Sequence, residues 1–124
     1  MGHGLVTARA DPRAVAAVWL PGLNRENCMA ETTQRGATVA VWLAADSRRA
    51  SAFPSGTFNC PNDDGSAVEL LFSYHRAPAE QVLVGLSGCS RITAPHRAAR
   101  GLTPQLRRDL SGLAPARWTK YFVG

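Results

Sequence analysis

The sequence has no long apolar run, and it has only three cysteines, three histidines and a single lysine. Its longest apolar stretches are interrupted by Pro21, Asp46 or Gly85, well short of the roughly 20 residues that a membrane-spanning helix needs. It also lacks the C-x-x-C and H-x-x-x-H spacings typical of metal sites and the spacing of an EF-hand. We therefore expect a soluble chain with no transmembrane segment, no metal site and no cofactor.

What remains is an ordinary globular composition. With 124 residues, of which 45% are hydrophobic and 19% are charged, the chain has enough apolar material for one core and no sign of disorder. It shows no repeat and no linker long enough to divide it. We therefore expect a single domain over residues 1–124.

Positive charge is concentrated in the C-terminal part of the chain. Residues 76–124 contain eight basic and two acidic side chains, whereas residues 1–75 contain six basic and seven acidic ones. A basic surface of this kind attracts nucleic acid, an anionic membrane surface or another acidic polymer, although it can also be merely solvated. The charge alone does not choose between these partners.

The clearest structural pattern lies between residues 67 and 87. Two apolar sets alternate with other residues, as in half-buried strands, on either side of the sequence HRAPA. Because a slip of one residue would turn one set to the other face, opposed positions must have an even sum. We predict a hairpin with a loop over 75–79 and with the pairs Tyr74–Glu80, Phe72–Val82, Leu70–Val84 and Val68–Leu86.

Before this hairpin we expect a strand, a loop and a helix. Residues 14–20 combine β-branched and aromatic types and favour a strand, and residues 24–32 are polar and loop-like. Residues 33–49 predict a helix, with Thr33 as its cap and an apolar face at Ala37, Val41 and Ala44, although Val39 to Trp42 would also suit a strand.

A short helix follows the hairpin. Thr103 as cap, Pro104 at the first position and an apolar stripe at Leu106, Leu110 and Leu113 predict a helix that ends near Gly112. The tail from residue 116 holds further aromatic residues and could form a last strand or cover the core. The fold class predicted is therefore α+β: a small antiparallel sheet with a central β-hairpin, packed against one longer and one short helix.

Two of the cysteines are placed to form a disulfide at the open end of the hairpin. Cys60 precedes the turn into the first strand and Cys89 follows the second, which brings both to the same end. We expect a Cys60–Cys89 disulfide, worth about 3–4 kcal/mol by the chain-entropy argument. Cys28 has no obvious partner, and we expect it to be a buried thiol, with an intermolecular bridge or a partner lost with a trimmed terminus as the alternatives.

Two motifs carry a resemblance to a known group of proteins. The C-P-x-D-x-G segment at residues 60–65 and the V-x-L-S-G-C segment at residues 84–89, with the later leucine-rich helix, resemble a small domain of predicted secreted or lipoprotein-like actinobacterial proteins. The resemblance covers the C-terminal half. It implies an extracytoplasmic setting and supports the Cys60–Cys89 bridge, and it brings no established activity.

Candidate functional residues lie in the basic loop that follows the hairpin. Arg91, His96, Arg97 and Arg100 combine positive charge with a loop setting, so we predict a ligand-binding surface there. A catalytic alternative is a small basic hydrolase or nuclease that uses His96 with nearby arginines. It is less favoured because His75 is expected at the hairpin tip, roughly 20 Å from the end where His96 lies.

The sequence thus favours a non-catalytic, extracytoplasmic binding or interaction module. Its partner would be an anionic polymer or an acidic protein surface, bound through residues 91–108, with nucleic acid as a weaker option. A cytoplasmic location is the alternative, since no export signal is present between residues 1 and 124. No residue is assigned a catalytic role.

Overall fold

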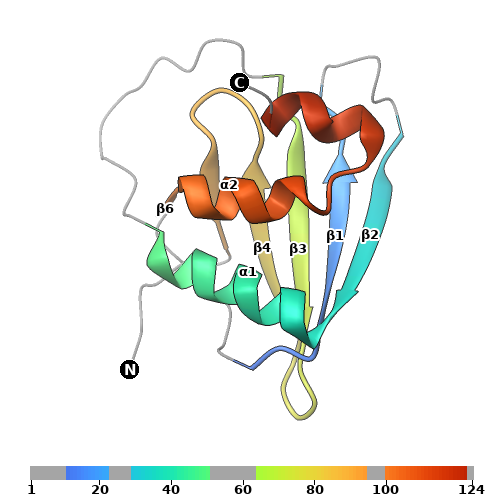
Figure 1. Ribbon diagram of the computed structural model, residues 1–124, viewed down its shortest axis with the longest axis vertical. Helices are drawn as coiled ribbons and strands as arrows, with labels where there is room; N and C mark the ends of the chain where they lie inside the picture. The colour runs from blue at the N-terminus through green and yellow to red at the C-terminus, as the bar shows by residue number, and fades with distance from the viewer. Residues whose placement is uncertain (1–10, 23–28, 51–63, 95–99, 123–124) are drawn as a thin grey trace.

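The computed structural model describes residues 11–22, 29–50, 64–94 and 100–122 (Figure 1). In chain order the elements are β1 (Ala14–Leu20), β2 (Glu31–Gly36), α1 (Ala37–Arg49), β3 (Ala67–Ser73), β4 (Glu80–Gly85), β5 (Arg91–Thr93), β6 (Arg100–Gly101), α2 (Pro104–Ser111) and the 3-10 helix η2 (Ala116–Phe122).

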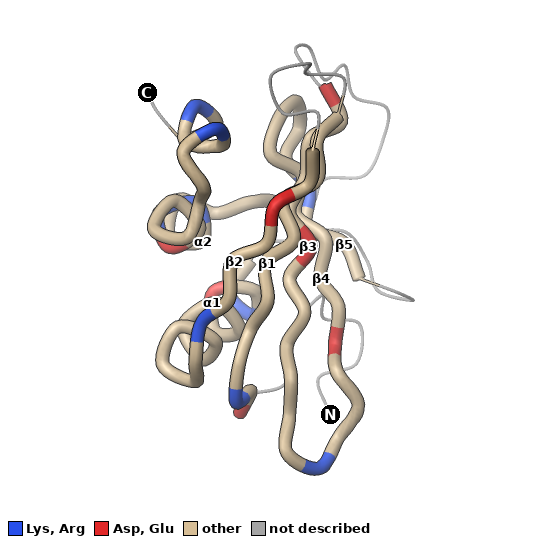
Figure 2. The backbone as a smooth tube through the Cα atoms, turned by 90° about the vertical axis from the view of Figure 1, so that its right-hand side faces the viewer, with Lys and Arg blue, Asp and Glu red and all other residues tan. Residues whose placement is uncertain are grey.

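The six strands form one antiparallel sheet in the order β2-β1-β3-β4-β5-β6. The hairpin of β3 and β4 is central, and the two helices lie against the same side of the sheet, as Figure 2 shows edge-on. The predicted α+β class is confirmed. No helix in the described part of the chain is long and apolar enough to cross a membrane.

The inner face of the sheet follows from strict alternation along the three central strands. In β1 every second residue is buried, from Val15 to Trp19, and β3 repeats the pattern from Val68 to Phe72. Direct pairing of Val15 with Phe72 places both sets on one face. This register produces a continuous apolar surface for the helices.

The predicted hairpin has the right faces and the wrong register. Phe72 pairs with Glu80 rather than Val82, and Val68 pairs with Val84 rather than Leu86, so the predicted register is wrong by two residues. A shift by two keeps every side chain on its face, so the alternation could not distinguish the two registers. Leu86 instead donates its backbone N–H to the oxygen of Ser66, at 2.9 Å.

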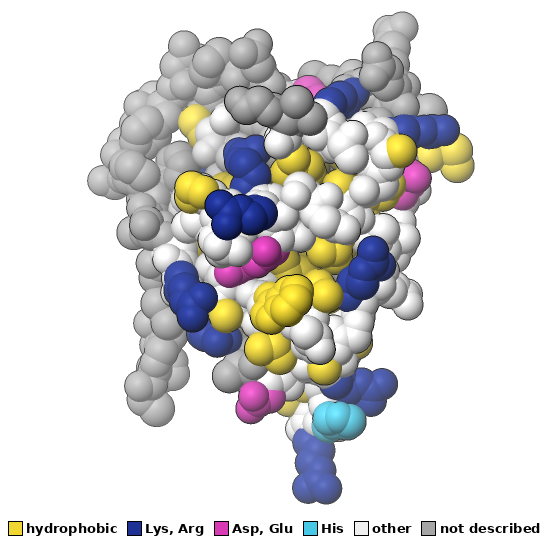
Figure 3. Space-filling view, in the orientation of Figure 1, with side chains coloured by type: hydrophobic (Ala, Val, Ile, Leu, Met, Phe, Trp, Pro, Cys, Tyr) yellow, Lys and Arg dark blue, Asp and Glu magenta, His cyan; other side chains and the backbone are white. Residues whose placement is uncertain are grey.

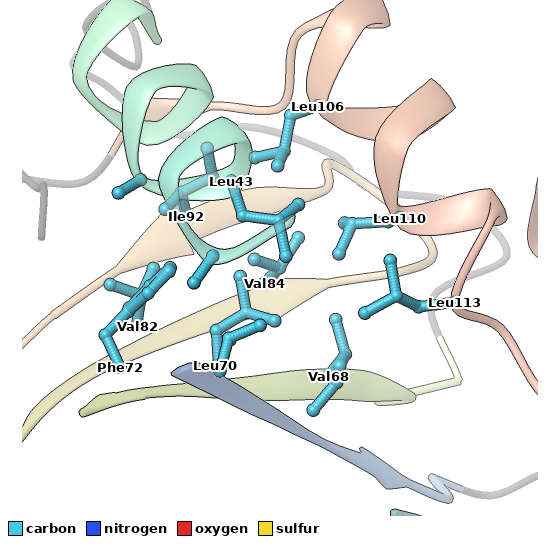
Figure 4. Close-up of a cluster of buried hydrophobic side chains, with 14 of the residues drawn as sticks. Leu43, Val68, Leu70, Phe72, Val82, Val84, Ile92, Leu106, Leu110 and Leu113 are labelled. Atoms are coloured by element: carbon cyan, nitrogen blue, oxygen red, sulfur yellow. The ribbon is translucent and has the colours of Figure 1, made fainter. Parts of the chain in front are cut away.

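The core lies between the sheet and the helices. In Figure 4, Leu43 of α1, Leu106 and Leu110 of α2, and Leu113 just after α2 point toward the valines and leucines of β3 and β4. Leu43, Leu106 and Leu110 are fully buried. Because the leucines of both helices enter one cluster, α1 and α2 are held next to each other as well as against the sheet.

The first helix is shorter than predicted, and its buried face agrees with the predicted one only in part. α1 begins at Ala37, and residues 31–36, expected as loop and first helical turns, form strand β2. Thr33 is therefore no cap: it lies in β2 and accepts a hydrogen bond from Trp19 Nε1 at 3.0 Å. The buried face contains Ala40, Leu43, Ala44 and Ser47, while Ala37 and Val41 are exposed.

The C-terminal elements match the sequence more closely. α2 starts after Thr103, whose hydroxyl accepts the N–H of Leu106 at 3.2 Å, with Pro104 at its first position. The tail covers the core as η2 rather than as a strand, with Trp118 fully buried. Its ring centroid lies 5.9 Å from that of Trp19, so aromatic packing anchors the tail to β1.

Candidate binding groove between the two helices

A groove of about 440 Å³ runs between α1 and α2, on the side of the helices away from the sheet. The side chains around it come from both helices: Val41, Trp42, Ala45, Asp46, Arg49, Gln105 and Asp109. In Figure 3, hydrophobic surface lies directly beside acidic side chains in this region. Its volume lies within the range usual for ligand sites.

Trp42 is the apolar part of the groove. The inward face of α1 is taken by Ala40, Leu43 and Ala44, so the helical repeat turns Trp42 outward. Its side chain is 55% exposed, whereas Trp19 and Trp118 are fully buried. An exposed tryptophan beside a groove resembles the residues that dominate binding energy at interfaces.

Asp46 is the buried polar part of the groove. Only 4% of this residue is exposed, and its Oδ2 atom has no hydrogen-bond partner among the described residues. Burial, and then the hydrogen bond and negative charge of Asp109, raise the pKa of Asp46 to about 7, with Arg49 opposing the shift. Below neutral pH the carboxyl group therefore keeps a proton, which it can donate to Asp109.

The outer rim of the groove is polar and ordered by contacts within α2. Gln105 donates from Nε2 to Asp109 Oδ1 at 3.2 Å, one helical turn away. Arg49 lies on the opposite wall, in the last turn of α1. The groove thus offers an apolar platform, hydrogen-bond donors and hydrogen-bond acceptors within one concave surface.

The position of Asp46 does not suit a general acid. A general acid must deliver its proton to a substrate, but the Asp46 oxygen that lacks a hydrogen-bond partner is buried from solvent. In the described ranges no group of three or more His, Cys, Asp or Glu side chains is placed to hold a metal ion.

A second polar cluster surrounds Asp64 and has a structural role. Its Oδ2 accepts the hydroxyl of Tyr121 at 2.7 Å, and its Oδ1 accepts the N–H of Ser66 and the hydroxyl of Ser87, each at 2.9 Å. Burial alone would raise the pKa of Asp64, but these hydrogen bonds outweigh it and lower the pKa to about 2. The cluster ties η2 to the ends of β3 and β4.

Two of the four predicted ligand-binding residues are among those that the structure describes. Arg91 is exposed at the start of β5, and Arg100 begins β6, which pairs with β5. His96 and Arg97 lie outside the described residues. The structure thus brings Arg91 and Arg100 onto neighbouring strands and leaves the rest of the predicted surface untested.

The predictions for His75 and the cysteines also fall partly on described residues and partly outside them. His75 lies exposed in the loop between β3 and β4, as expected for the hairpin tip. Cys89 lies between β4 and β5, beside a cleft of about 240 Å³, but Cys60 and Cys28 lie outside the described residues. The Cys60–Cys89 bridge stays a prediction.

Sequence reasoning missed the groove altogether. Trp42 lies within the predicted helix, but no predicted site included it, and its side chain is exposed. The signal that could have found the site is the wheel of α1, where Trp42 and Asp46 are one turn apart and thus share a side. Comparisons of the chain with family models, curated proteins and solved structures found no match.

Proposed function

We propose that the protein is a non-catalytic binding module whose ligand occupies the α1–α2 groove, with Trp42 as the main contact. The observation that carries the proposal is the exposure of Trp42, the only one of the three tryptophans left open within the described chain. A flat aromatic surface next to fixed polar groups suits a ligand that is partly apolar and partly hydrogen-bonding.

Fragment mapping by NMR tests this proposal and requires no known ligand. A library of small, chemically varied fragments is titrated into isotope-labelled protein, and the backbone amide shifts of each element are followed. We expect the bound fragments to shift residues of α1 and α2 around Trp42, because binding energy concentrates in such pockets. Fragments that collect elsewhere, with the groove silent, would overturn the proposal.

Two variants sharpen the mapping. Trp42→Ala removes the aromatic platform and should abolish the groove shifts while leaving the fold intact, since the side chain is 55% exposed. Leu83→Ala is the matched control: Leu83 is also exposed, at 37%, but it points from the sheet face opposite to the helices. Equal loss in both variants would show that the shifts do not report on the groove.

The basic C-terminal part supports a second proposal, binding of an anionic polymer or acidic protein surface through residues 91–108. The exposure of Arg91 and Arg108 favours it. Binding to heparin should weaken steeply with salt and with charge reversal at Arg97 and Arg100, but not at Arg76 in the hairpin loop. Affinity that is indifferent to salt and to these changes would count against it.

The setting and the catalytic alternative remain proposals as well. An extracytoplasmic location rests on the predicted Cys60–Cys89 bridge. A hydrolase or nuclease that uses His96 would turn over RNA or ester substrates, and His96→Ala would remove that turnover. Saturable binding without turnover supports the binding module.

A further inference from the structure

The polar and charged groups of the groove restrict the kind of ligand that it can hold. We propose that the groove binds a neutral saccharide, with one pyranose ring stacked on the indole of Trp42 and its hydroxyls bonded to the polar rim. This inference rests on the proposed use of the groove for binding. It names the class of ligand.

The apolar side of the groove suits the shape of a sugar ring. Trp42 and Val41 are 55% and 39% exposed, and Ala45 lies next to them along the same groove. A pyranose ring has faces of C–H groups, which pack flat on an aromatic ring, and a rim of hydroxyl groups. A rigid indole provides this contact at little entropic cost, because few of its torsions need to be fixed.

The polar rim of the groove can form hydrogen bonds with sugar hydroxyls. Each sugar hydroxyl both donates and accepts, so it needs partners of both kinds. The Asp109 carboxylate and the Gln105 carbonyl accept, and the Arg49 guanidinium donates. The bond from Gln105 to Asp109, at 3.2 Å, holds both side chains before any ligand arrives.

The charges around the groove are of both signs, which favours a neutral ligand over a strongly charged one. Asp46 carries no charge below about pH 7, so the charged groups in the lining are Arg49 and Asp109. Arg108 adds a positive charge at the rim through its bond to Gln105 Oε1 at 3.5 Å. A cationic ligand would be attracted by Asp109 but repelled by Arg49 and Arg108, and an anionic ligand would be attracted by these arginines but repelled by Asp109, whereas a neutral ligand meets no repulsion. The volume of about 440 Å³ and the open shape leave room for a sugar ring with its neighbours in a chain.

Matched oligosaccharides test the proposal by isothermal titration at pH 6. The neutral probes are the tetramers of cellulose, amylose, mannan, xylan and N-acetylglucosamine; the charged probes are tetraglucosamine, a cation, and tetragalacturonate, an anion. We expect at least one neutral tetramer to bind with a Kd below about 10 mM, and about tenfold more tightly than either charged probe.

The variants identify where the sugar binds. Trp42→Ala should weaken the neutral tetramer at least about tenfold, Trp42→Tyr should restore part of the affinity because it restores an aromatic face, and Leu83→Ala should change nothing. Circular dichroism of each variant confirms that the fold is kept.

Three results would overturn the inference. They are no binding by any neutral tetramer, tighter binding of a charged probe, and an affinity that Trp42→Ala leaves unchanged. If fragments still occupy the groove while no neutral tetramer binds, the ligand class is wrong and the binding module stands. If neither fragments nor saccharides occupy the groove, both proposals fail.

Discussion

Replacing Asp46 by asparagine should change how the stability of the protein depends on pH. The folded protein holds the Asp46 proton up to about pH 7, whereas an unfolded chain releases it near pH 3.8. A raised pKa in the folded state adds stability that is complete below the unfolded pKa and is lost as pH rises through the folded value. Asp46 therefore makes the protein progressively less stable between about pH 4 and pH 7.

The size of the effect follows from the shift. At 1.36 kcal/mol for each unit of pKa, the loss between pH 5 and pH 8 is at most about 3 kcal/mol, and structural relaxation will reduce it. Asp46→Asn keeps the shape, leaves an N–H to donate to Asp109 and has no charge to bury. The variant should therefore gain stability over the natural chain as pH rises.

Urea unfolding measured by circular dichroism at pH 5, 6, 7 and 8 provides the assay. The difference in unfolding free energy between Asp46→Asn and the natural chain isolates this carboxyl group, because all other groups titrate in both. Asp109→Asn should remove only part of the pH dependence, since burial is the larger cause of the shift. A difference that stays constant within about 0.5 kcal/mol across this range would refute the reasoning.

Three further predictions concern the rest of the fold. Tyr121→Phe removes the hydroxyl bond to Asp64 and should cost about 1–2 kcal/mol in urea unfolding at pH 7, with acid unfolding moved to higher pH; unchanged acid unfolding would contradict this. Gly22→Ala should destabilise by about 2 kcal/mol or more, because its Cβ would lie 1.9 Å from the Asp64 backbone oxygen, whereas Gly36→Ala, with nothing within 4 Å, should unfold like the natural chain. Peptide mapping without reductant should recover a Cys60–Cys89 linkage from protein made in an oxidising compartment, and three free thiols would reject it.

Local chemistry explains which elements the sequence could predict. Strand β1, the two hairpin strands and helix α2 follow from alternation and from the Thr103–Pro104 start, which are signals contained within each segment. Such signals fix the buried face of a strand. They do not fix its register, since the observed pairing of Leu70 with Val82 and the predicted pairing with Val84 bury the same side chains.

Strand β2 and the face of α1 depend on tertiary contacts that the sequence does not show. β2 is the edge strand of the sheet, and most of its side chains are exposed to solvent. Polar residues are therefore suited to this strand. It is held by distant partners: Glu31 accepts the Trp118 indole N–H at 2.9 Å, and Thr33 accepts that of Trp19. With residues 33–36 taken by the strand, the helix starts later.

The candidate site was missed for a related reason. Trp42 is apolar, and apolar residues are expected inside, so only the position of α2 shows that it borders a groove. The hydrogen bond between Asp46 and Asp109 joins two segments that are far apart in the sequence, and no local sequence pattern indicates it. Charge along the chain drew attention to residues 91–108, where two of the four predicted ligand residues, Arg91 and Arg100, lie on described strands.

The three indole N–H resonances test the central claim, that the groove beside Trp42 holds the ligand, most directly. They are followed by NMR while the tightest ligand from the fragment or saccharide titrations is added at pH 6. Trp19 and Trp118 are fully buried and serve as internal controls. The account predicts that the Trp42 resonance shifts and saturates with the binding isotherm while the other two stay in place; a saturating ligand that leaves Trp42 unmoved would contradict it.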